Sequence, residues 1–168
     1  TGEERWVYDA EIDSTGVQSH ICRGVTYWQA PNSQDGDACS KRIFMATVDA
    51  RLVAVDADTG KSCDDFGAQG AVDLMQGMGN YRGSGSYATS PPLMINDLLV
   101  LGAFVKDNFK SDMAGGVVRA FDARTGELRW AFDPVPPSMT PRSSNIYWIL
   151  AIGFHLLKDT LFVWSSKA

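Results

Sequence analysis

Basic clusters, long apolar runs and long amphipathic helices are all lacking in this sequence of 168 residues. The net charge is −5 and no stretch concentrates Lys or Arg, which argues against a nucleic-acid-binding surface. The longest apolar run, residues 146–157, is too short to span a bilayer and contains His155. A helix in that run is a minor alternative, so we expect an all-β chain. The 16 glycines indicate many turns, and the length is enough for one domain with a real core.

A repeated Thr-Gly motif is what the sequence has instead. Its full form is Ala120-Phe-Asp-Ala-Arg-Thr-Gly-Glu-Leu-Arg-Trp130; residues 54–60 repeat the first half and residues 1–6 the second. The Thr-Gly pairs begin at residues 1, 59 and 125. Gly supplies the positive φ of a tight turn, Asp can bond the turn backbone, and Trp offers a flat surface for stacking. Three copies in register with strands indicate a repeat architecture.

Short apolar segments around these turns predict the strands. We expect strands at 5–9, 22–28, 43–48, 52–55, 98–105, 117–121 and 128–132, and a weaker one at 72–74. Residues 43–48 and 52–55 lack clean alternation, which indicates a sheet covered on both faces. Each repeat then holds about four antiparallel strands, the blade of a β-propeller. We place the blade boundaries near 1–13, 14–86 and 87–140, with 141–168 as the start of a further, divergent blade. Because the chain starts halfway through a repeat, we interpret it as a fragment.

Three cysteines are present, at positions 22, 39 and 63. Cys39 precedes one strand of a predicted hairpin and Cys63 follows the other, so the two lie near each other at its open end. A disulfide there would suit an exported protein. Two free, partly buried thiols of a cytosolic protein fit the pattern as well.

Several separate segments, in order, resemble one family. They are Cys22-Arg-Gly-Val-Thr-Tyr-Trp, Tyr87-Ala-Thr-Ser-Pro-Pro, Val105-Lys-Asp-Asn-Phe and Gly116-Val-Val-Arg-Ala-Phe-Asp, together with the Thr-Gly-x-x-x-Trp motif. Through about residue 140 the chain is similar to dehydrogenases that use pyrroloquinoline quinone, in the membrane-bound glucose, quinate and polyol branch. The resemblance implies part of an eight-bladed propeller with tryptophan-docking motifs. It also implies a periplasmic, membrane-associated enzyme that oxidises a sugar or polyol and passes electrons to membrane quinone, with the missing blades as its partners.

The resemblance carries site residues over by position. Arg23 matches the arginine that holds a carboxylate of the quinone cofactor, for which a guanidinium fork is suited. Thr89 and Ser90 match a strand start whose hydroxyls face that cofactor. His20 is a weaker match, because it stands one residue after the family's position. The alternatives from the residues themselves are an ion-paired Arg, turn chemistry at Thr-Ser-Pro-Pro, and a structural His.

A calcium site is implied at Asp107 and Asn108, which fall where relatives place an acidic or amide ligand. Oxygen donors of this kind suit calcium, which would polarise the carbonyl that accepts hydride. A solvated Asp-Asn turn is the simpler alternative. The general base expected of the family has no match, since Asp56 and Asp122 are explained by turns. We therefore expect the isolated chain to fold weakly and to be inactive.

The sequence differs from the family pattern at two places. The middle repeat has Asp64 at the Trp position, and Cys63 and Phe66 are expected to fill that interface instead. After Pro141, the sequence Asn145-Ile-Tyr-Trp-Ile-Leu departs from the family.

One alternative function is a non-catalytic propeller that acts as an envelope scaffold or binding module. Another is a sugar-binding propeller that uses aromatics such as Trp28 and Tyr81.

Overall fold

The computed structural model describes residues 2–15, 23–34, 36–76, 88–103 and 116–133. His20, Tyr81, Asp107, Asn108 and the segment 134–168 lie outside these described residues. Within the described ranges the structure has strands and turns and no helix, so it contains no helix that could cross a membrane.

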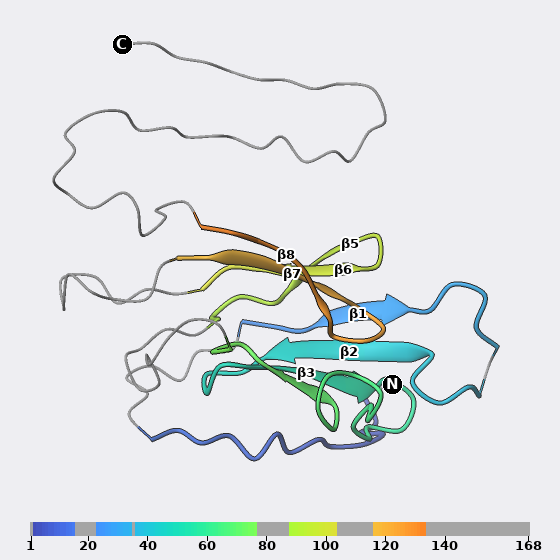
Figure 1. Ribbon diagram of the computed structural model, residues 1–168. Coiled ribbons are helices and arrows are strands. Elements are labelled where there is room, and N and C mark those ends of the chain that lie inside the picture. The colour runs from blue at the N-terminus through green and yellow to red at the C-terminus, as the bar shows by residue number, and fades with distance from the viewer. Residues whose placement is uncertain (1, 16–22, 35, 77–87, 104–115, 134–168) are drawn as a thin grey trace, which may run out of the picture. The chain divides into compact units, whose positions relative to one another are not determined.

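Two four-stranded antiparallel sheets make up the structure (Figure 1). The first has the order β1-β2-β3-β4, with strands Thr26–Gln29, Lys41–Ala46, Arg51–Asp56 and Ala71–Asp73. The second has the order β5-β6-β7-β8, with strands Leu93–Ile95, Leu98–Leu101, Val118–Asp122 and Leu128–Phe132. Each repeat thus folds as four sequential antiparallel strands, which confirms the predicted blade.

Three strand predictions need correction. Residues 5–9 form no strand, because no described strand pairs with them and a ladder requires a partner. Strand β6 ends at Leu101, and Gly102 and Ala103 have already left the ladder. Strand β2 does alternate: Arg42, Phe44 and Ala46 are buried, whereas its other residues are half-buried. The buried position of Arg42 hid this alternation in the sequence, since a charged residue there interrupts the apolar pattern.

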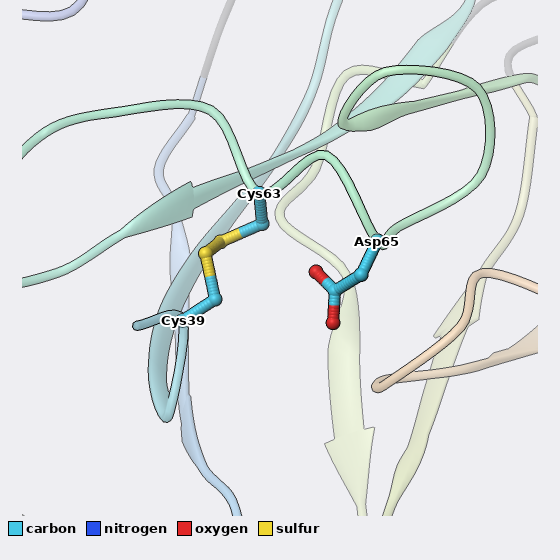
Figure 2. A group of neighbouring side chains, drawn as sticks. All are labelled: Cys39, Cys63 and Asp65. Atoms are coloured by element: carbon cyan, nitrogen blue, oxygen red, sulfur yellow. A yellow bond between two sulfur atoms is a disulfide. The ribbon is translucent and has the colours of Figure 1, made fainter. Parts of the chain in front are cut away.

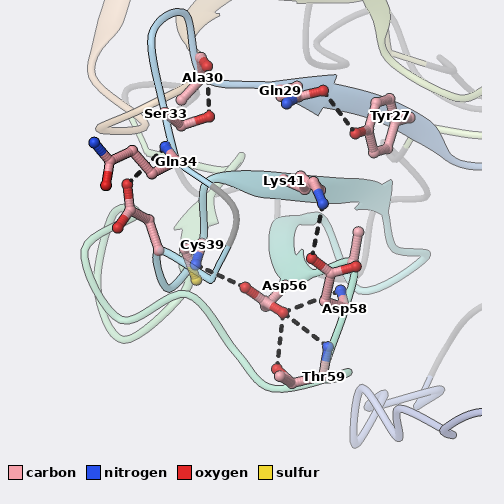
Figure 3. Close-up of polar contacts among 12 residues, drawn as sticks. Tyr27, Gln29, Ala30, Ser33, Gln34, Cys39, Lys41, Asp56, Asp58 and Thr59 are labelled. Atoms are coloured by element: carbon pink, nitrogen blue, oxygen red, sulfur yellow. Dashed lines mark hydrogen bonds and ion pairs between the residues drawn. The ribbon is translucent and has the colours of Figure 1, made fainter.

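The Thr-Gly turns behave as the sequence predicts. Gly60 and Gly126 have φ of 71° and 75°, and the amide of each donates to the carbonyl of the Asp four residues earlier, at 2.9 Å. In the first turn the carboxylate of Asp56 accepts hydrogen bonds from the amide and hydroxyl of Thr59 (Figure 3). Asp122 accepts the same pair from Thr125 in the second turn. Both aspartates therefore serve the turns.

One apolar core joins the two sheets. Phe44 and Leu52 of the first sheet and Leu99 of the second are fully buried in it. Phe66 also lies in this core, with its ring centroid 5.3 Å from that of Phe44. Burial of these aromatic and aliphatic side chains is the main stabilising term for the pair of blades.

Polar contacts join the sheets at both ends. At one end, the hydroxyl of Thr26 donates to the carbonyl of Pro92. At the other, the amide of Gly67 donates to the carbonyl of Thr125 at 2.9 Å. We call the first the Arg23 end, where β1 and β5 begin and β2 and β6 finish. The second is the Thr-Gly end, which holds both Thr-Gly turns.

Candidate cofactor site and the family it belongs to

The Arg23 end brings together two of the segments that the sequence singles out. A Cβ added at Gly24 would lie 3.8 Å from Cγ of Pro91, which is ordinary van der Waals contact. Arg23 precedes Gly24 and Ser90 precedes Pro91, so two predicted cofactor-binding residues lie next to residues that are close to each other in space. They are 67 positions apart in the sequence, and the packing of β1 in the first sheet beside β5 in the second brings them together.

Exposure distinguishes the side chains at this end. Arg23 and Ser90 are exposed and Thr89 is half-buried. Arg23 forms no ion pair with another described residue, and a guanidinium fork suits an anionic ligand. Two hydroxyls and a guanidinium form a donor set for carboxylates, in which only the guanidinium carries charge. The residues present therefore fit a planar ligand that carries carboxylates, such as pyrroloquinoline quinone.

No position is described for the two residues that the sequence predicts as calcium ligands. Asp107 and Asn108 belong to the connection between β6 and β7, outside the described residues. The described residues on either side of that connection, Ala103 and Gly116, adjoin the ends of β6 and β7 that lie at the Arg23 end. The metal role of Asp107 and Asn108 stays a prediction, as does the cofactor role of His20.

The Thr-Gly end contains the two cysteines for which the sequence left a disulfide or free thiols open. Cys39 and Cys63 form a disulfide, with a Cα–Cα distance of 5.8 Å (Figure 2). The ligand atoms of Asp65 and both cysteines lie within 4.8 Å of one another, which resembles a metal-ligand cluster. Both sulfurs are committed to their mutual bond, however, and the carboxylate of Asp65 pairs with Arg42 at 2.5 Å. We therefore assign this group to structure and not to metal binding.

A group of contacts at the Thr-Gly end was missed from sequence. The indole Nε1 of Trp28 donates to Asp97 at 2.9 Å, and the guanidinium carbons of Arg42 and Arg124 lie 5.7 and 5.5 Å from the centroid of its ring. Trp28 is only 5% exposed, so it belongs to the interface between the sheets. An exposed carbohydrate-stacking role for Trp28 in a sugar-binding propeller is therefore wrong.

The tryptophan-docking motif is visible directly. A Cβ on Gly60 would lie 2.7 Å from ring carbons of Trp6, so the indole covers the first Thr-Gly turn. At the second turn, a Cβ on Gly126 would lie 3.3 Å from the ring of Phe66 and 2.7 Å from Val72. Phe66 thus takes the place of the missing tryptophan, as predicted. In both cases an aromatic ring from one repeat docks on the turn of the next.

Comparison with known proteins identifies the family of this chain. Residues 1–149 match the family described as pyrroloquinoline quinone glucose/ethanol/alcohol dehydrogenase, β-propeller domain. The chain is 40% identical to a quinate/shikimate dehydrogenase (quinone) from Acinetobacter baylyi, over 97% of the chain and 23% of that protein. It is also 40% identical to a quinoprotein glucose dehydrogenase from Gluconobacter oxydans, over 82% of the chain and 18% of that protein.

A solved structure agrees at the level of the backbone. The quinohemoprotein alcohol dehydrogenase from Comamonas testosteroni superposes with a TM-score of 0.60 at 26% identity, over 83% of the chain and 18% of that protein. The chain spans about a fifth of the length of the curated relatives it matches. The repeats, the docked aromatic rings and these similarities lead to one conclusion: the chain belongs to the pyrroloquinoline quinone-dependent dehydrogenase family and forms blades of its β-propeller domain.

Proposed function

We propose that this chain supplies part of the cofactor site of a dehydrogenase that oxidises a sugar or polyol alcohol. Pyrroloquinoline quinone, when bound, supplies a carbonyl that accepts hydride from the alcohol carbon. The observation that carries the proposal is the contact between the Cys-Arg-Gly and Thr-Ser-Pro-Pro segments through Gly24 and Pro91. That proximity supports a shared site for Arg23 and Ser90, since both residues lie at the same end of the two blades.

Each residue has a task that follows from its chemistry. Arg23 would hold a cofactor carboxylate in a bidentate, charge-assisted contact and so fix the plane of the quinone. Thr89 and Ser90 would donate to the same anionic edge. Asp107 and Asn108 would hold calcium beside the accepting carbonyl. The general base that takes the alcohol proton would come from a segment outside this chain, and the isolated chain would be inactive.

We infer an exported protein that acts next to a membrane. A stable disulfide between Cys39 and Cys63 suits an oxidising compartment such as the periplasm. One relative is named as a dehydrogenase (quinone), which supports membrane quinone as the electron acceptor. Glucose and quinate dehydrogenases are about equally similar to this chain, so both are candidates for its substrate class.

Reconstitution tests this function directly. The full-length protein that contains this chain would be stripped with a chelator and then supplied with pyrroloquinoline quinone, calcium, both or neither. Glucose, quinate and simple polyols would be offered, and reduction of a redox dye would be followed. We expect activity only when the cofactor and calcium are both present. A protein that binds no pyrroloquinoline quinone would instead be a non-catalytic propeller scaffold.

A further inference from the structure

Two buried arginines join the same two sheets at opposite ends. Arg42 in β2 is 3% exposed and Arg119 in β7 is 7% exposed. Burial of a cation is costly unless its donors are satisfied, so each of these residues needs a structural explanation. The two explanations differ, and the difference concerns the cofactor site.

Arg42 is fully accounted for by packing at the Thr-Gly end. Its guanidinium donates to the carbonyl of Arg124 at 2.6 Å and pairs with Asp65, while its Nε donates to the carbonyl of Cys39 at 2.8 Å. These contacts fasten the first sheet, through the disulfide-linked loop, to the second Thr-Gly turn. Nothing in this set faces the Arg23 end.

Arg119 lies at the Arg23 end. Its Nη2 donates to the carbonyl of Leu74 at 2.6 Å, directly beyond the end of β4 in the other sheet. Burial lowers the pKa of Arg119 and the carboxylate of Asp73 opposes that shift; arginine stays charged in proteins. The side chain thus holds the last turn of the first blade against the second.

Arg119 lines a small pocket that also reaches Ala88, the residue before Thr89. Arg119, Leu74 and Ala88 line it together, and its volume of about 10 Å³ leaves room for one water molecule at most. Ala88 is 4% exposed and immediately precedes Thr89 and Ser90. Arg119 and the residue that precedes those two hydroxyls therefore line the same pocket.

We propose that Arg119 is a positioning residue for the cofactor site: by holding Leu74 in the wall of the pocket that it shares with Ala88, it fixes where Thr89 and Ser90 lie relative to Arg23. This inference rests on the proposed function. Loss of the guanidinium leaves the Leu74 carbonyl without its donor and enlarges the pocket that Ala88 lines. The hydroxyls then have to be ordered when the cofactor binds, which weakens its affinity.

The test compares the two arginines in the full-length protein. R119M and R119K are the test variants, and R42K is the matched control, because Arg42 bridges the same sheets away from the site. Binding of pyrroloquinoline quinone at fixed calcium would be titrated by quenching of tryptophan fluorescence. The melting temperature of the cofactor-free protein and hydrogen exchange of residues 88–90 would be measured alongside.

We expect all three variants to melt at lower temperature than the wild type. R119M should raise the Kd for the cofactor about tenfold, and R119K, which keeps one donor, about threefold. R42K should keep the wild-type Kd within about twofold, since it leaves the Arg23 end intact. Faster exchange at residues 88–90 should accompany the Arg119 variants and not R42K.

Two results would overturn the inference. If the wild type binds and R119K and R119M retain its Kd and its exchange at residues 88–90, Arg119 is only a tie between blades. If R42K raises the Kd as much as R119K does, general loosening of the interface is the cause. R119K keeps a donor and is expected to fold even where R119M does not. A wild type that fails to bind would overturn the proposed function itself, and that result is seen before any variant is compared.

Discussion

The indole of Trp6 lies so close to Gly60 that any side chain at position 60 would overlap the ring, since a Cβ there would be 2.7 Å from its carbons. The same indole donates through Nε1 to the carbonyl of Ala57 at 3.1 Å. One residue thus both covers the Thr-Gly turn of the next repeat and satisfies a carbonyl of that turn. This contact links successive blades independently of the sheet ladders.

Substitution G60A should therefore destabilise the protein by about 2–4 kcal/mol, the sum of a strained φ and an overlap with Trp6. The matched control is G36A, because Gly36 also has a positive φ, of 97°, but has nothing within 4 Å of the Cβ position. Urea unfolding of the full-length protein measures both. Equal losses in G60A and G36A would show that the docking of Trp6 contributes nothing.

Phe66 should be as important as a docking tryptophan. Its ring is fully buried and lies against Gly126 and Phe44. We expect F66A to cost about 3–5 kcal/mol through loss of transfer free energy and formation of a cavity. The control is V7A. Val7 is 74% exposed, so this substitution should change stability by less than about 0.5 kcal/mol. A small effect of F66A in urea unfolding would mean that the aromatic position is not occupied in solution.

The disulfide should stabilise the first blade. It closes a loop with a sequence separation of 24 residues, for which loop-closure entropy gives about 3 kcal/mol. The double variant C39S/C63S should lower the free energy of unfolding by this amount, and a thiol reductant should do the same to the wild type but not to the variant. Equal stability with and without reductant in the wild type would contradict the bond.

Acid should weaken the Thr-Gly turns. Burial alone would raise the pKa of Asp56, but hydrogen bonds from the Cys39 amide and from Thr59 outweigh it, and the pKa is lowered. The pKa of Asp122 is lowered in the same way by Thr125 and Arg124. Because the folded-state pKa values lie below 3.8, the ordinary value for an aspartate, this stabilisation is complete above that pH and is lost as pH falls through the lowered values.

Thermal melting between pH 7 and pH 3 tests this dependence. The wild type should hold its melting temperature down to about pH 4 and then lose it steeply. The double variant D56N/D122N should start lower and fall less, because its turns no longer titrate. Parallel pH profiles of variant and wild type would show that other carboxylates govern the acid transition.

The repeat could be predicted from sequence because its signals are local. Turn chemistry at Asp56 and Asp122 requires residues within four positions of each other, and the alternation of apolar segments sets the strands around it. The position of Phe66 also follows from the repeat, since an aromatic residue near the missing Trp is the natural substitute. The strand predicted at residues 5–9 is wrong because a strand needs a hydrogen-bonded partner, and the composition of a segment does not reveal whether it has one.

The two bridging arginines could not be predicted for a related reason. Arg42 and Arg119 occupy strand positions where a charged residue normally indicates an exposed face. Their acceptors are carbonyls 82 and 45 residues away in sequence, and carbonyls have no residue type to recognise. The contact of Gly24 with Pro91 is equally non-local. Resemblance to the family indicated both segments of the site, but only the fold shows that they touch.

The most direct test of the account is the affinity of the full-length protein for pyrroloquinoline quinone when Arg23 is removed. R23M would be compared with the wild type and with R129M, which removes the same charge from an exposed arginine paired with Glu127. We expect R23M to raise the Kd about 10- to 100-fold, the value of a charged hydrogen-bond pair, and R129M to leave it unchanged. Wild-type affinity in R23M would show that this end of the blades does not hold the cofactor.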